Sequence, residues 1–183
     1  EKVYFRNDSG KFNYIDNDWG SWWKSSFTNS QNASTGGDIH TIIDYTGTNI
    51  SNRENFCLHS LFQGNQNLIS ASNLTLPSSL VVGEFQYMFN ICYSLTTPPA
   101  LPATVMTDNC YQGMFQDCTA LTTAPVLPAT TLADYCYYAM FQSSGLTSAP
   151  SLPASTSFGS VSTNVGVVAC TITDHRRLVC YTA

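Results

Sequence analysis

The second half of this chain repeats one short pattern at a nearly constant interval. Cys110-Tyr-Gln-Gly-Met-Phe115 is followed by Cys136-Tyr-Tyr-Ala-Met-Phe141, and the same frame holds Glu84-Phe-Gln-Tyr-Met-Phe89 upstream. A looser copy, Cys57-Leu-His-Ser-Leu-Phe62, comes before it. Periods of roughly 20–50 residues indicate a solenoid or array. One such unit cannot bury its own apolar face, so the sequence predicts that the copies stack on one another, with Met88-Phe89, Met114-Phe115 and Met140-Phe141 as a stripe of the core.

A second sequence block recurs at the same interval as the first, and it indicates the local structure of each unit. Leu95-Thr-Thr-Pro-Pro-Ala-Leu-Pro and Leu121-Thr-Thr-Ala-Pro-Val-Leu-Pro share one frame. Proline lacks the N–H that a strand ladder needs, so the strand is expected to be short. Leu132, Cys136 and Met140 recur at every fourth position, which favours one stripe of a short helix. The predicted unit is a strand, a proline-rich turn, a short helix and a turn.

Composition and patterning divide the chain into three parts. Residues 1–55 form a β-rich segment, with strands expected at 3–6, 11–15 and 38–45 and an irregular loop over 24–37. Residues 56–160 hold the repeats, as four units that start near 57, 84, 110 and 136, with an insertion at 70–73. Residues 161–183 form a C-terminal hairpin cap with strands at 167–173 and 178–181. In that hairpin Cys170 lies opposite Cys180, where a disulfide is geometrically feasible.

The composition limits the function classes that fit. Charged residues make up 10% of the chain, against about a quarter in an average soluble domain. Ser, Thr and Asn replace them, which suits an extracellular or cell-surface location. A net charge of −5 without a Lys/Arg cluster argues against nucleic acid as a partner. No apolar run approaches the roughly 18 residues of a membrane span, so membrane insertion is not expected. The opening Glu1-Lys2-Val3 leads us to expect a mature product or a fragment of a longer protein.

Five of the seven cysteines follow the repeat, and the other two are Cys170 and Cys180 of the C-terminal hairpin. Cys57, Cys110 and Cys136 share one position of the frame, and Cys92 and Cys118 share another. We expect a ladder of buried thiols that act as small apolar groups, with disulfides between units as the alternative. Metal and cofactor sites are not expected, because no CxxC or Cys/His spacing occurs. An irregular calcium site at Asp16 and Asp18 is the remaining alternative to a solvated turn.

The repeats resemble a known family. The segments Met114-Phe115-Gln-Asp-Cys118-Thr-Ala-Leu121-Thr-Thr-Ala-Pro125-Val-Leu127-Pro128 and Cys136-Tyr-Tyr-Ala-Met140-Phe141 are similar to BspA-type bacterial leucine-rich repeats, found on surface proteins of Bacteroidetes and on some of their mobile elements. The resemblance covers roughly residues 56–155. It implies a right-handed α/β solenoid, a location outside the cell or at its surface, and adhesive or ligand-binding roles. It carries over no catalytic or cofactor-binding residue.

Several aromatic and hydroxyl side chains are candidates for ligand contact. Trp19, Trp22 and Trp23 either cover the open end of the stack or bind a ligand, since exposed aromatics stack on sugars and anchor interfaces. Tyr111, Tyr137 and Tyr138 flank the repeat cysteine and are expected to point partly outward. Thr97 and Thr123 are expected on the strand face, as members of a repeated hydroxyl surface.

The sequence therefore predicts a module without catalysis. The expected role is adhesion or ligand binding at a bacterial surface, and the expected partner is a host or bacterial surface protein or a glycan. The alternative is a structural or receptor-binding part of a larger assembly, such as a fibre or a phage or virion decoration. Self-association through the solenoid ends is a further expectation. Paired carboxylates for glycan hydrolysis would require Asp108 and Asp134, which share a repeat position, to converge in a cleft.

Overall fold

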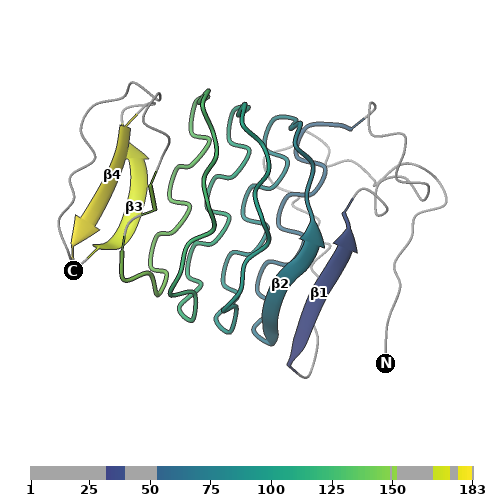
Figure 1. Cartoon of the computed structure of the whole chain (residues 1–183), viewed down its shortest axis with the longest axis vertical. Coiled ribbons are helices and arrows are strands. Elements are labelled where there is room, and N and C mark those ends of the chain that lie inside the picture. Colours follow the sequence, from purple (N-terminus) through teal and green to yellow (C-terminus); the bar gives the residue numbers. More distant parts are fainter. Residues whose placement is uncertain (1–31, 40–52, 149, 152–166, 174–176, 183) are drawn as a thin grey trace, which may run out of the picture.

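The described part of the computed structural model comprises residues 32–39, 53–148, 150–151, 167–173 and 177–182. Its strands are β1 (Ala33–Asp38), β2 (Leu68–Thr75), β3 (Val167–Thr173) and β4 (Arg177–Thr182). Within these ranges the structure contains no helix. The first two strands form a two-stranded parallel sheet, and the last two form an antiparallel hairpin (Figure 1).

The β1–β2 pair corrects two expectations about the N-terminal half. Residues 33–38 form a strand where an irregular loop was predicted, and β2 occupies the stretch that was read as an insertion. The apolar residues of β2 explain its formation, because Leu68, Ala71 and Leu74 are buried while the residues between them are exposed or half-buried. Gly36 permits the close pairing, since a Cβ there would lie 2.7 Å from the Cβ of Asn73. The strands expected at 3–6 and 11–15 lie outside the described residues, as does most of 38–45.

The repeats lie side by side as four units, which we number 1 to 4 from their frame positions 57, 84, 110 and 136 (Figure 1). Backbone hydrogen bonds of 2.8–3.0 Å join each unit to the next. In unit 2, for example, the N–H groups of Phe85, Tyr87 and Phe89 donate to carbonyl groups of unit 3. The acceptors are Cys110, Gln112 and Met114, each one residue before the matching frame position. Along the consecutive turns, the N–H group of every second residue bonds to the next unit, so neighbouring units follow parallel backbone paths. The units therefore stack in register at a spacing of about 4.8 Å, as strands do.

The short helices expected near 132–140 are not found in the described residues. The N–H groups that do not reach the next unit donate instead to the carbonyl three residues back, as Gln86 does to Gly83 and Met88 does to Phe85. The segment is thus a series of consecutive β-turns. Every fourth residue has a positive φ, for example Gly83, Tyr87 and Ile91 in unit 2. Continuous turns leave half of the N–H groups free to join the units, whereas helical bonds would consume all of them.

Columns of identical or similar side chains fill the interior of the stack. Phe62, Phe89, Phe115 and Phe141 stack face to face, with ring centroids 5.3–5.7 Å apart and planes within 8° of parallel. The Met-Phe pairs of units 2 to 4 are buried, which confirms the predicted core stripe. The thiols of Cys92 and Cys118 each donate at 3.1 Å to a phenylalanine carbonyl of the preceding unit. The core is therefore a set of columns that run along the stack, each adding one member per unit.

The C-terminal strands agree with the sequence-based expectation in place and pairing. β3 and β4 are antiparallel, and their register sets Cys170 opposite Cys180. Residues 174–176 of the connecting turn lie outside the described residues. The disulfide between the two cysteines, and the role of the hairpin as a cap, stay predictions.

Candidate functional site

The structure separates the predicted ligand-binding residues into exposed, buried and undescribed groups. Thr97 and Thr123 are exposed, and 38% of the Tyr138 surface is exposed. Tyr111 and Tyr137 are fully buried, so the prediction that they point partly outward is wrong. Their rings stack on Phe85 and on each other with centroids 5.8 and 6.0 Å apart, a column that excludes solvent. Trp19, Trp22 and Trp23 lie outside the described residues.

Exposed hydroxyl groups recur at one place in units 2, 3 and 4. In the sequence Leu-Thr-Thr, the leucine is buried in the core (Leu95 and Leu121) and both threonines face outward. We call the exposed side chains of this frame the hydroxyl surface: Thr96, Thr97, Thr122, Thr123, Thr147 and Ser148.

Backbone contacts hold the N-terminal end of the hydroxyl surface against β2. The backbone N–H and the hydroxyl of Thr96 both donate to the carbonyl of Ile69, at 2.9 and 3.1 Å. The carbonyl of Thr97 accepts the N–H of Ala71 at 2.8 Å. Tyr93, three residues before Thr96, is 43% exposed, and its carbonyl accepts from the N–H of Ala120 in the next unit. An exposed aromatic residue therefore lies three positions before Thr96 in the chain, where the backbones of units 2 and 3 are joined.

The hydroxyl surface contains no charged residue. Between Glu84 and Asp174 the only charged residues of the chain are Asp108, Asp117 and Asp134. Asp108 and Asp134 lie in neighbouring units, but one carboxylate oxygen of Asp108 accepts the backbone N–H of Asp134 at 3.1 Å. That carboxylate oxygen therefore links two turns of neighbouring units.

Tyr138 belongs to a different stretch of the unit, on the consecutive turns. It contacts Tyr135 edge to face, with ring centroids 5.7 Å apart, and the two rings are exposed to a similar degree. Gln112, in the equivalent position of unit 3, accepts from the Gln86 amide at 2.8 Å and donates to the Tyr87 hydroxyl at 3.2 Å. Its amide is therefore engaged within the stack, which leaves Tyr138 and Tyr135 as the exposed aromatic pair of this face.

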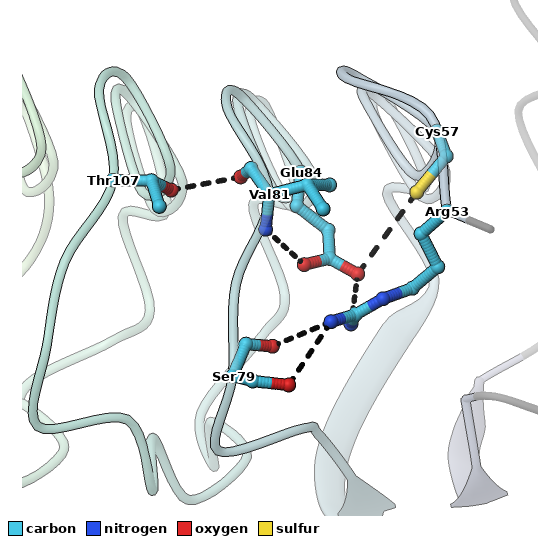
Figure 2. Close-up of polar contacts among 6 residues, drawn as sticks. All are labelled: Arg53, Cys57, Ser79, Val81, Glu84 and Thr107. Atoms are coloured by element: carbon cyan, nitrogen blue, oxygen red, sulfur yellow. Dashed lines mark hydrogen bonds and ion pairs between the residues drawn. The ribbon is translucent and has the colours of Figure 1, made fainter. Parts of the chain in front are cut away.

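A buried ion pair is the feature that sequence reasoning missed. Glu84 stands in the frame position that holds cysteine in the other units, and its carboxylate lies 2.6 Å from the guanidinium of Arg53 (Figure 2). The other oxygen accepts the N–H of Val81 at 3.1 Å, and Arg53 also donates to the backbone and hydroxyl oxygens of Ser79. Only 4% of the Arg53 side chain and none of Glu84 is exposed. The sequence did contain a signal for this ion pair, because Glu84 is the one acidic residue at a frame position that holds cysteine in units 1, 3 and 4.

Burial acts on the pKa of both acidic groups in this cluster, Glu84 and Cys57. Burial raises the pKa of Glu84, although the Val81 N–H and the Arg53 guanidinium both act to lower it. Burial, followed by the nearby Glu84 carboxylate, raises the pKa of the Cys57 thiol to about 12. The Cys57 sulfur lies 3.9 Å from Glu84 (Figure 2). The cluster thus ties the start of unit 1 to unit 2 and offers no thiolate at neutral pH.

The remaining described thiols are equally unreactive by their surroundings. Cys92, Cys110, Cys118 and Cys136 are free and buried, which confirms the expected ladder of buried thiols over disulfides between units. Burial raises the pKa of Cys92 and Cys110 to about 12 and that of Cys136 to about 11. Because the thiolate is the nucleophile, such groups are suited to packing.

Within the described residues, no three His, Cys, Asp or Glu side chains lie close enough together to hold a metal ion. The same part of the chain contains no helix that is long and apolar enough to cross a membrane. Comparisons of the chain with protein-family models, with curated proteins and with solved structures gave no match.

Proposed function

We propose that this chain is an extracellular binding module without catalysis, which attaches a bacterial surface to a host or bacterial surface protein or to a glycan. The observation that carries the proposal is the hydroxyl surface, in which exposed, uncharged hydroxyl groups recur from unit to unit. Such a surface offers many weak hydrogen bonds and few groups that could transfer a proton or attack a substrate. A binding role requires only the weak hydrogen bonds.

The stacking of the units supports the architectural part of the proposal. We interpret the four units as a short solenoid of the leucine-rich-repeat type, because each unit bonds its backbone to that of the next and shares its core columns. Solenoids of this kind expose extended faces that repeat with the units, and such faces serve binding. The consecutive turns take the place of the helices that the resemblance implied.

Binding of the purified chain to arrays of glycans and of extracellular proteins tests this function. We expect specific binding to at least one ligand class, and three variants assign the site: Thr97→Lys with Thr123→Lys, Tyr138→Ala, and Trp22→Ala with Trp23→Ala. The substitution Gln66→Lys, at an exposed position of unit 1, is the matched charge control. Absence of binding to every arrayed ligand by a folded chain would contradict the proposal.

The alternative, a structural or receptor-binding part of a larger assembly, draws on a different observation. The N–H groups of Gly113, Phe115 and Asp117 in unit 3 donate to carbonyls of unit 4. Within the described residues, their equivalents at Ala139, Phe141 and Ser143 have no acceptor. A neighbouring copy or subunit that presented carbonyl groups at this end would continue the ladder.

Sedimentation velocity over a range of concentrations tests the assembly alternative. Head-to-tail association predicts species that grow with concentration without a closed end point. Replacement of the exposed Ser143 by Lys, a residue that blocks edges in natural sheets, is expected to reduce them. A monomer at every concentration would exclude self-association. The alternative would then be limited to assembly with a different subunit or to receptor binding.

A further inference from the structure

We propose that the hydroxyl surface binds a single extended, uncharged polysaccharide chain that runs across the units, so that successive sugar residues contact successive units. This inference rests on the proposed binding function and names its ligand class. Three properties of the surface support it: its spacing, its free hydrogen-bonding groups and its lack of charge.

The spacing follows from the way the units stack. Backbone hydrogen bonds of 2.8–3.0 Å join the units, and chains joined in this way lie about 4.8 Å apart. The stacked phenylalanine rings keep the same period through the core, with centroids 5.3 to 5.7 Å apart. A pyranose ring in an extended β-1,4-linked chain advances the polymer by a similar length. A sugar bound at one unit therefore places the next sugar over the next unit.

The hydroxyl surface has hydrogen-bonding groups to spare. The hydroxyl of Thr96 donates to the carbonyl of Ile69, and its oxygen lies 3.4 Å from the hydroxyl oxygen of Thr97. The hydroxyls of Thr122 and Thr123 have no hydrogen-bond partner within the described part of the chain. A threonine hydroxyl can both donate and accept, as each sugar hydroxyl can. These side chains match a polyol better than a ligand that only accepts or only donates.

The lack of charge near these threonines in the sequence limits the class of ligand further. No charged side chain occurs from residue 118 to 133 or from 85 to 107, the stretches that contain the threonines of units 2 and 3. The surface therefore provides no counter-charge for an anionic polymer or an acidic peptide. Tyr93, 43% exposed and three residues before Thr96 in the chain, has an aromatic ring of the kind that stacks on the apolar face of a sugar. An uncharged polysaccharide satisfies both properties.

Isothermal titration calorimetry with β-1,4-linked glucose oligomers, from the disaccharide to the hexasaccharide, tests the inference. We expect the affinity to rise with each added sugar up to about the number of units that carry the hydroxyl surface, units 2 to 4, and then to level off. Binding should change little between low and high salt, because surface charge contributes nothing. Thr97→Val with Thr123→Val keeps the side-chain shape and removes two hydroxyls. At about 1 kcal/mol per hydrogen bond, this pair is expected to weaken the longest oligomer by about tenfold or more.

Two controls separate this inference from the proposed function. Thr104→Val removes an exposed threonine hydroxyl outside the hydroxyl surface and should leave the affinity unchanged. Tyr138→Ala removes an exposed ring on the consecutive turns and should also leave it unchanged. Thermal unfolding of each variant verifies that the stack is intact.

Several results would overturn the inference. Affinity that does not depend on oligomer length, or that falls with Tyr138→Ala and not with the threonine pair, would overturn it while the binding function stands. Failure of the chain to bind any oligomer while it captures an arrayed protein would have the same meaning. Failure to bind any oligomer and any arrayed ligand would overturn both proposals.

Discussion

At the scale of the residue, Glu84 shows how one departure from a repeat reorganises its neighbourhood. Cysteine at this position in the other units needs no partner, whereas a buried carboxylate does. Arg53, far upstream in the sequence, supplies it at 2.6 Å. The frame identified Glu84 as the exception. It could not identify Arg53, because the partner of a buried charge is set by the folded path and not by sequence spacing.

Separation of this ion pair is expected to destabilise the protein strongly. Glu84→Gln would leave the guanidinium of Arg53 buried and uncompensated, which typically costs about 3–5 kcal/mol. Replacement of both residues, as Arg53→Met with Glu84→Leu, should recover most of that free energy of unfolding. Urea denaturation measures both variants, and Glu54→Gln at an exposed position is the control. A loss below about 1 kcal/mol for Glu84→Gln would show that the pair is solvated.

The buried tyrosines also concern single residues. The sequence placed Tyr111 and Tyr137 beside a buried cysteine and could not tell which side of the turn they occupied, since consecutive turns do not alternate as a strand does. Within the described residues, both hydroxyls are buried without a hydrogen-bond partner. Phe85 occupies the same position of the column in unit 2, and it has no hydroxyl that would need a hydrogen-bond partner.

Removal of the Tyr111 hydroxyl is therefore expected to be neutral or stabilising. An unsatisfied buried hydroxyl costs about 1–3 kcal/mol, so Tyr111→Phe should raise the free energy of unfolding by up to that amount. Tyr138→Phe, at an exposed ring, should leave it unchanged. Parallel thermal and urea unfolding measure both. A clear destabilisation by Tyr111→Phe would mean that the hydroxyl bonds an ordered water.

At the scale of the element, the missing helices have an instructive cause. Leu132, Cys136 and Met140 recur at every fourth position, which suits a helix, but the consecutive turns of this fold have the same period, as the positive φ values of Tyr135, Ala139 and Ser143 show. Apolar spacing alone cannot distinguish the two. The backbone N–H groups decide, because turns free half of them to bond the next unit.

Two glycines test the consecutive turns directly. Gly113 has a φ of 58° and lies beneath the Tyr87 ring, 2.3 Å from where a Cβ would be. Gly64 has a φ of 77° with nothing within 4 Å of that position. Gly64→Ala should cost only the left-handed backbone penalty of about 1–2 kcal/mol, and Gly113→Ala should cost more. The difference should shrink when Tyr87→Ala is added. Urea denaturation measures the set, and equal costs for the two glycines would contradict the packing of Tyr87 on Gly113.

At the scale of the whole molecule, the repeat frame predicted most of what the structure contains in residues 53–148. It predicted part of the core, because stacked units bury the same position in every copy: the Met-Phe pairs of units 2 to 4 are buried as expected, whereas the buried Tyr111 and Tyr137 were not foreseen. It did not predict the β1–β2 pairing. That contact is between Ala33–Asp38 and Leu68–Thr75, which share no repeat and meet only through the three-dimensional path.

The ladder between units predicts a gradient of protection from hydrogen exchange. The amide of Phe115 donates to the Met140 carbonyl at 2.9 Å, whereas the amide of Phe141 has no acceptor within the described residues. We expect Phe115 and its counterparts Phe62 and Phe89 in units 1 and 2 to exchange only on global opening, and Phe141 to exchange at least tenfold faster. Exchange measured by NMR distinguishes the two. Equal protection would show that an acceptor from residues 152–166 or from another molecule completes unit 4.

The direction of that ladder has a consequence for how such a chain can change over generations. On the consecutive turns, units 1 to 3 each give N–H groups to the unit after them and units 2 to 4 each give carbonyl groups to the unit before them, so one interior unit can follow another. A tandem duplication of one repeat in the gene would extend the stack without creating an unpaired seam. Unequal recombination could therefore lengthen or shorten the hydroxyl surface by one step at a time, while the ends of the chain stayed as they are.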